Sequence, residues 1–177
     1  MSSQNIRRLT VSAMCAALGV LLPLAFHGVQ DAGRIFLPMH LPILLCGLLC
    51  GPFYGLACGL IVPLISHLAT GMPPAAMLPV MLCELAVYGL VTGLASKIRI
   101  KNAFLQTLIP LVSAMLAGRA VTGVLNALVF QAGQYSLQIW LTGAFVKALP
   151  GIAVQLILLP LLIAALQRAK LTEKLKK

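Results

Sequence analysis

Long apolar runs, separated by short polar or glycine- and proline-rich stretches, make up most of this chain. A helix that crosses a bilayer needs roughly 20 predominantly apolar residues. The runs predict helices over residues 9–27, 41–50, 53–68, 77–95, 103–130 and 143–167. Gly51-Pro52 separates the short second helix from the third. Pro150 and Pro160 predict kinks in the last helix.

Positive charge is concentrated in three short segments. Ten of the thirteen Lys and Arg residues lie in residues 7–8, 97–101 and 168–177. Short basic segments beside apolar helices mark the cytoplasmic side of a membrane. If residues 41–68 crossed the membrane once, segment 97–101 would face the side opposite residues 7–8. Two crossings place all three segments on one side, so we expect six spans with both termini cytoplasmic. The short second helix must then tilt, stop part-way or be shielded by protein.

The composition supports this topology. The 177 residues are 60% hydrophobic and 9% charged, and their mean hydropathy is +1.02. A soluble domain carries roughly 25% charged residues. We therefore expect an all-α integral membrane protein, with residues 1–177 forming one six-helix domain in a prokaryotic plasma membrane. The net charge of +10 reflects cytoplasmic loops better than a nucleic-acid interface.

Several function classes lack their sequence signatures. No GxxxxGK[ST] loop is present, so we expect no ATP binding by this chain. The five cysteines form no CxxC pair, which argues against a zinc site. Neither a nucleophile elbow nor an HExxH motif occurs, so we expect no enzyme activity and no cofactor. The first apolar run lacks a good cleavage site and is interpreted as a span.

Three charged residues interrupt the apolar runs. A charge inside the hydrocarbon costs several kcal/mol, so such residues usually face the protein interior and have a function. In the six-span topology Glu84, Arg119 and Lys147 fall in the outer halves of their helices. Other polar residues reach the same side, whereas the cytoplasmic half offers almost nothing comparable. The sequence therefore predicts a one-sided polar site open to the outside, built from Glu84, Arg119, Lys147, Asn126, His67, Arg34, His40 and Trp140.

Structural explanations of these residues remain open. Glu84 is also suited to a buried salt bridge with Arg119 or Lys147, and Lys147 to snorkelling towards the interface. The remaining residues have ordinary roles as well. Arg34 suits a solvated loop, the two histidines suit structural hydrogen bonds, and Trp140 suits an interfacial aromatic belt.

Small residues recur at four-residue spacing along several helices. Such patterns allow close helix approach in lipid. Ala13 and Ala17 give the first helix a smooth cytoplasmic half, which suits docking of another protein. The other examples lie in helices two to four: Gly47, Gly51, Gly55 and Gly59, then Gly89 and Gly93.

Taken in order, these segments resemble the substrate-binding (S) component of energy-coupling factor (ECF) vitamin transporters. The resemblance covers nearly the whole chain. It rests on the six spans, the Ala13-xxx-Ala17 pair and three sequence stretches. These are Leu37-Pro38-Met39-His40-Leu41-Pro42 leading to Cys50-Gly51-Pro52-Phe53-Tyr54-Gly55, then Thr70-Gly71-Met72-Pro73-Pro74, and Glu84-Leu85-Ala86-Val87-Tyr88-Gly89.

The resemblance implies a transport mechanism. Such proteins bind a micronutrient from outside and dock on a transmembrane coupling protein, EcfT, which is driven by two ATPase subunits. ATP turnover in those partners is thought to topple the S component. The resemblance places Glu84, Tyr88, Arg119, Asn126 and Lys147 at the pocket. It also implies that residues 28–40 form a gate and that Ala13 and Ala17 form the coupling surface.

The substrate does not follow from the resemblance. Nickel and cobalt members carry a histidine after the initiator methionine, but Ser2 stands here, so we expect no metal substrate. A pocket of acid, base and amide suggests a polar molecule with an anionic group. Pantothenate, folate-like pterins, pyridoxine-type rings and deazapurine bases remain open. A membrane scaffold without a ligand and a stand-alone secondary carrier are the competing interpretations. The carrier is disfavoured because inverted repeats are not apparent.

Overall fold

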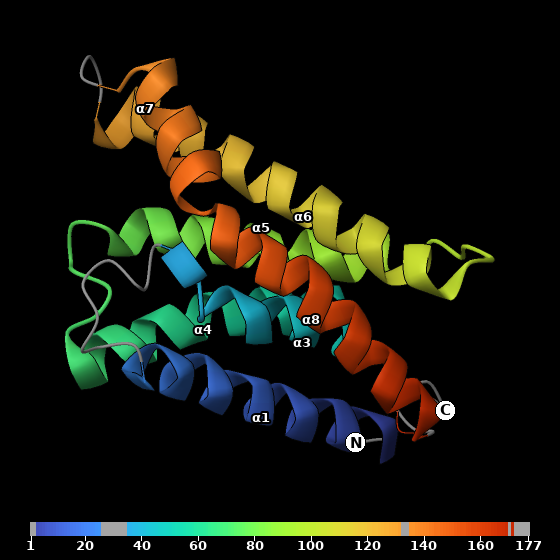
Figure 1. Ribbon diagram of the computed structural model, residues 1–177. Helices are drawn as coiled ribbons and strands as arrows, with labels where there is room; N and C mark the ends of the chain where they lie inside the picture. The colour runs from blue at the N-terminus through green and yellow to red at the C-terminus, as the bar shows by residue number, and fades with distance from the viewer. Residues whose placement is uncertain (1–2, 26–34, 132–134, 170, 172–177) are drawn as a thin grey trace.

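The computed structural model describes residues 3–25, 35–131, 135–169 and 171. Every regular element within these residues is helical (Figure 1), which confirms the all-α prediction. The helices are α1 (Ser3–Ala25), α3 (His40–Cys50), α4 (Pro52–Thr70), α5 (Leu78–Ala95), α6 (Ala103–Leu125), α7 (Leu137–Leu141) and α8 (Leu149–Arg168). Two π-helical segments, η1 (Asn126–Phe130) and η2 (Thr142–Lys147), extend α6 and precede α8.

Five of the described helices are long and apolar enough to cross a membrane: α1, α4, α5, α6 with η1, and α8. The predicted class of multi-pass membrane protein is therefore supported. Helix α3 has only 11 residues. At 1.5 Å per residue it rises about 16 Å, roughly half of a 30 Å hydrocarbon layer. A sixth membrane crossing through α3 therefore requires other residues to span the remaining half of the hydrocarbon layer.

The basic segments gather at one end of the bundle (Figure 1). The start of α1, the turn between α5 and α6 and the end of α8 lie together there. They carry residues 7–8, residues 97–101 and Arg168, and we call this the basic end. The connection from α4 to α5 and helix α7 lie at the opposite end.

Helix α3 forms the centre of the bundle, in contact with α1, α4 and α5. Most of its residues are buried, including Ile43, Leu44 and Cys46, which have no exposed surface. Glycines allow its neighbours to approach closely. A Cβ atom added to Gly47 would lie 2.7 Å from the carbonyl oxygen of Gly89, and one added to Gly89 would overlap the backbone of Gly55. The small-residue spacing predicted from sequence thus corresponds to close packing of α3, α4 and α5.

The chain departs from the predicted helix boundaries mainly near its two ends. Helix α1 begins at Ser3 instead of Leu9. The predicted loop at residues 131–142 contains α7, whose first turn is capped by the Ser136 side chain. The prediction that the last helix begins at Gly143 was wrong, because residues 142–147 form η2 and α8 starts at Leu149. Pro150 accordingly lies in the first turn of α8, where proline is tolerated.

Candidate functional site

A cavity of about 1150 Å³ opens between the helices at the end opposite the basic end. Its floor lies where α3 begins, because His40, the first residue of that helix, lines the cavity and is 3% exposed. A helix that crossed the whole membrane would fill the space above His40. Because α3 is short, the cavity occupies that space instead. Six of the predicted site residues line it: His40, Glu84, Arg119, Asn126, Trp140 and Lys147.

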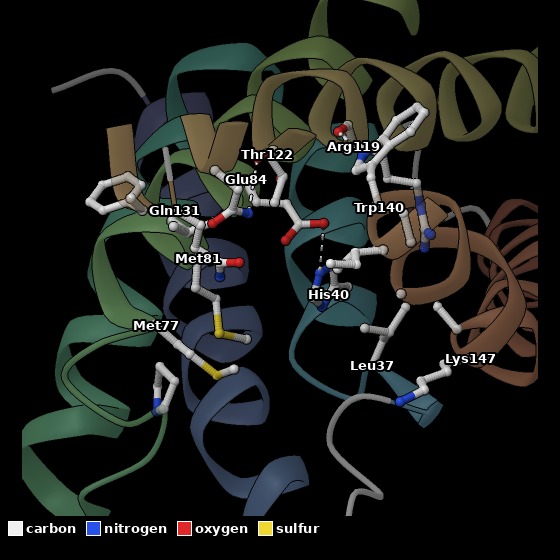
Figure 2. A pocket seen from close by; sticks show the side chains of 18 of the residues that line it. Leu37, His40, Met77, Met81, Glu84, Arg119, Thr122, Gln131, Trp140 and Lys147 are labelled. Carbon is white, nitrogen blue, oxygen red and sulfur yellow. Dashed lines mark hydrogen bonds and ion pairs between the residues drawn. The ribbon is translucent and has the colours of Figure 1, made fainter. Parts of the chain in front are cut away.

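His40 and Glu84 face each other at the floor (Figure 2). The Nε2 atom of His40 lies 3.8 Å from Oε1 of Glu84, too far for a hydrogen bond. Neither ring nitrogen of His40 has a hydrogen-bond partner among the described residues. A buried polar group without a partner costs free energy, and such groups in native structures call for an explanation. A bound polar molecule or water would supply the missing partners.

Tyr88 lies beneath His40 and Glu84. It lies one turn after Glu84 on α5, is 1% exposed, and packs its ring against that of His40 with centroids 5.1 Å apart. Gly118 on α6 allows close contact, because a Cβ atom there would lie 3.0 Å from the Tyr88 ring. The Tyr88 side chain also interacts with both Glu84 and Arg119. Tyr88, predicted to bind substrate, therefore lies beneath the floor and does not line the cavity.

Arg119 brings a buried positive charge to the same place. It is 4% exposed, and among the described residues no carboxylate forms an ion pair with it. Its guanidinium carbon lies 5.2 Å from the centre of the Phe145 ring, a cation–π arrangement. Its Nε atom has no hydrogen-bond partner in the described part of the chain. The sequence left open a salt bridge between Glu84 and either Arg119 or Lys147, and the described residues form neither.

The outer part of the cavity is formed by the ends of α6 and α7. The indole Nε1 of Trp140 donates a hydrogen bond of 3.0 Å to the carbonyl oxygen of Arg119, so Trp140 ties α7 to α6. Asn126 donates to Thr122 of its own helix. Burial raises the pKa of Tyr135 above its ordinary value, and the neighbouring Asn126 side chain opposes this. The Tyr135 phenol therefore stays protonated at neutral pH.

Apolar residues make up the walls, and sequence analysis did not identify them. Figure 2 shows Met77 and Met81 on one side of the cavity and Leu37 on the other. The sequence does not single these residues out, because a methionine or leucine in an apolar run gives the same pattern whether its side chain faces lipid or a cavity. Gln131, also missed, follows η1 and lines the cavity.

Lys147 lines the cavity as an exposed residue, and the remaining predicted residues that the structure describes lie outside the lining. Lys147 is exposed at the rim, where η2 ends. His67 lies outside the cavity lining, with its Nδ1 2.7 Å from the carbonyl oxygen of Pro73, which fits a structural role. Ala13 and Ala17 are exposed on α1. Arg34 and most of the predicted gate, residues 28–40, lie outside the described residues.

Helix α8 contacts residues 35–37, the segment that leads into the floor of the cavity. The side chain of Gln155, 2% exposed, donates a hydrogen bond of 3.3 Å to the carbonyl oxygen of Leu37. One turn earlier, a Cβ atom on Gly151 would lie 2.6 Å from the carbonyl oxygen of Ile35. Leu37 adopts a φ of 50°, which is uncommon for a residue other than glycine. We call this contact of Gln155 and Gly151 with residues 35–37 the α8 clamp.

Long apolar helices around a cavity with a polar floor are typical of a multi-pass membrane protein with a candidate binding site at one end. A model of the family described as "ECF transporter, substrate-specific component" matches residues 7–163. The chain belongs to this family, as the sequence resemblance indicated, and is a substrate-specific component of an ECF transporter. No curated protein and no solved structure matches the chain.

Proposed function

We propose that this protein captures a water-soluble vitamin or related micronutrient from outside the cell for an ECF-type importer. The observation that carries the proposal is the polar floor. His40 and Arg119 are almost completely buried, line one cavity, and keep polar atoms without hydrogen-bond partners in the described residues. A cavity of about 1150 Å³ has room for a vitamin-sized molecule, since ligand pockets usually measure roughly 300–1000 Å³.

The cavity faces outward in the proposed orientation. The basic end would be cytoplasmic by the positive-inside rule, with both termini inside and six crossings, α3 being the short one. Labelling of single engineered cysteines with a membrane-impermeant maleimide on intact cells tests this. Ala75→Cys, in the α4–α5 connection, should react, and Arg99→Cys should react only after lysis. The opposite result would reverse the orientation.

The energy for transport comes from partners. A family resemblance implies docking on an EcfT-like protein that is driven by two ATPase subunits, so that ATP binds to the partners and this chain needs no cofactor. Ala13 and Ala17, exposed on α1, are the proposed coupling surface. Toppling of the whole helix bundle would then carry the cavity inward.

A thermal-shift screen of the purified protein against water-soluble vitamins and nucleobases tests the proposed function. A ligand that binds only the folded protein raises its stability by mass action, by about 2.7 kcal/mol at a hundred times its Kd. We expect one compound to raise the melting temperature in a dose-dependent manner, and uptake of that compound to require the EcfT and ATPase subunits. No ligand in the full screen would favour a membrane scaffold. Uptake by this chain alone would favour a secondary carrier.

A further inference from the structure

Residues 137–147, which form α7 and η2, make up the outer wall of the cavity, and we call them the outer segment. Seven of these eleven residues line the cavity, and none of them is buried. A segment with few buried contacts separates from a protein at a lower free-energy cost than the packed helices do. The position of the outer segment therefore depends on the particular contacts that join it to the rest of the bundle.

Two aromatic side chains of the outer segment contact one residue of α6, Arg119. The indole Nε1 of Trp140 donates a hydrogen bond of 3.0 Å to the Arg119 carbonyl oxygen, and Figure 2 shows the two residues together at the cavity. The guanidinium carbon of Arg119 lies 5.2 Å from the centre of the Phe145 ring. The rings of Trp140 and Phe145 pack edge to face with centroids 5.6 Å apart. Gly123, one turn further along α6, makes room for the indole, because a Cβ atom there would lie 2.6 Å from Nε1. The outer segment thus contacts both the backbone and the side chain of Arg119.

Phe145 acts on the cavity through Arg119, because Arg119 lines the cavity and Phe145 does not. An arginine side chain has many rotamers, and ordering it when a ligand binds costs conformational entropy. The face of an aromatic ring attracts a guanidinium and therefore favours the rotamer that lies over it. A phenyl ring has no oxygen or nitrogen acceptor, so the guanidinium donors that Tyr88 does not use remain for a ligand.

We propose that Phe145 is a positioning residue of the binding site, which holds the Arg119 guanidinium in place before the substrate arrives. This inference rests on the proposed function and assigns the substrate a hydrogen-bond acceptor, neutral or anionic, at Arg119. Trp140 joins the same residue to the outer segment, so substrate binding and docking of that segment on α6 are coupled. A substrate that engages Arg119 stabilises the docked segment, and undocking of the segment weakens substrate binding by the same factor.

A double-mutant cycle on the purified full chain tests the role of Phe145. The probes are riboflavin, pantothenate, nicotinate, pyridoxine and folate, and the one that binds most tightly is used throughout. Phe145→Leu should weaken its binding by at least about fivefold, whereas Phe145→Tyr, which keeps the ring face, should change it by less than about twofold. In the Arg119→Met background Phe145→Leu should have almost no further effect, because the positioned group is absent. Phe104→Leu, which removes an exposed ring at the other end of α6, is the matched control and should leave binding unchanged.

Trp140 provides a second measurement, because it is the single tryptophan of the chain. Acrylamide quenching of its fluorescence in the ligand-free protein should roughly double in Phe145→Leu, since the outer segment then leaves α6 more often. The bound probe should lower quenching in the unmodified chain. Melting temperatures without ligand show that each variant is folded, and Phe145→Met replaces Phe145→Leu if the latter is not.

Unchanged affinity in Phe145→Leu, or an equal loss of affinity with and without the Arg119 side chain, overturns this inference while the proposed function stands. Unchanged quenching in Phe145→Leu overturns the coupling to the outer segment. If neither these probes nor any compound in the full vitamin screen binds, both the inference and the proposed function are overturned.

Discussion

At the residue scale, Arg119 is a buried charge that lines the cavity. Its side chain is 4% exposed, and the described residues offer it the Phe145 ring and Tyr88 but no carboxylate. Burial of a charge is costly unless the charge is paired and hydrogen-bonded. A protein that keeps such a charge unpaired in a cavity gains from it when a ligand supplies the partner, which is the reason to test this residue first.

Replacement of Arg119 by Met, which keeps the length and removes the charge, should weaken binding of the tightest ligand. A hydrogen bond to a charged group contributes roughly 1.5–3 kcal/mol, so affinity should fall by about ten- to a hundredfold. The melting temperature without ligand should stay the same or rise, because burial of a charge that no described carboxylate pairs costs more than its contact with Phe145 contributes. Arg99→Met, exposed at the basic end and away from the cavity lining, is the matched control and should change affinity by less than about fivefold. Unchanged affinity with a lowered melting temperature would assign Arg119 a structural role.

The sequence identified the charged residues of the floor but not which of them lie close to one another. Glu84 and Arg119 stood out because a charge in an apolar run is rare. The separation of Lys147 from them was not predictable, because η2 alters the helical register before α8 begins. The distances that set His40 beside Glu84 depend on packing between α3 and α5, which no single-sequence pattern contains.

At the element scale, the close packing of α4 and α5 holds one side of the floor in place. Gly89→Ala should destabilise the protein, because the added methyl group would overlap the carbonyl oxygen of Gly55 and neither backbone is able to move far in a helix. Overpacking of this kind costs about 1–3 kcal/mol. Gly143→Ala is the control, since its Cβ would meet nothing within 4 Å. Chemical or thermal unfolding in detergent without ligand measures both, and equal stability of the two variants would contradict the packing argument.

The α8 clamp links a distant helix to the floor. Gln155→Leu, similar in volume, removes the hydrogen bond to Leu37 and should release residues 35–37, which lead into His40. A neutral hydrogen bond contributes about 1 kcal/mol, so the ligand should bind about fivefold more weakly, mainly through faster dissociation. Gln167→Leu, exposed on the same helix, is the control. A lower melting temperature with an unchanged dissociation rate would show that Gln155 only stabilises the bundle.

The elements themselves were predicted well where glycine and proline mark their ends. The predicted bounds of the second to fourth helices differ from those of α3, α4 and α5 by at most two residues, because Gly51-Pro52 and Thr70-Gly71 end helices through local backbone chemistry. The predicted helix 103–130 covers α6 and η1, whereas α7 and the start of α8 were not predicted, because they depend on tertiary contacts. The bond from Trp140 to Arg119 is one such contact.

At the scale of the whole molecule, the two ends of the bundle differ in chemistry. The basic end carries solvated charges, and the opposite end holds the cavity. Helix α1 begins at the basic end, and only Ser12, Cys15 and Gly19 of its residues are buried. Large apolar side chains such as Met14 and Leu18 are exposed along it. A span with so little internal packing is free to pack against another membrane protein.

Ala13 and Ala17, exposed on that surface one turn apart, allow a partner helix to approach closely. Replacement of both by Leu should abolish assembly with the EcfT and ATPase subunits and abolish uptake. Ligand binding by the isolated protein should be unchanged, because neither residue lines the cavity. Ala57→Leu, exposed on α4, adds the same bulk to a different face and should leave assembly intact. Co-purification of the complex and ligand affinity of the isolated chain, measured on the same variants, separate coupling from folding. If ligand affinity fell together with assembly, the two alanines would belong to the internal packing of the bundle.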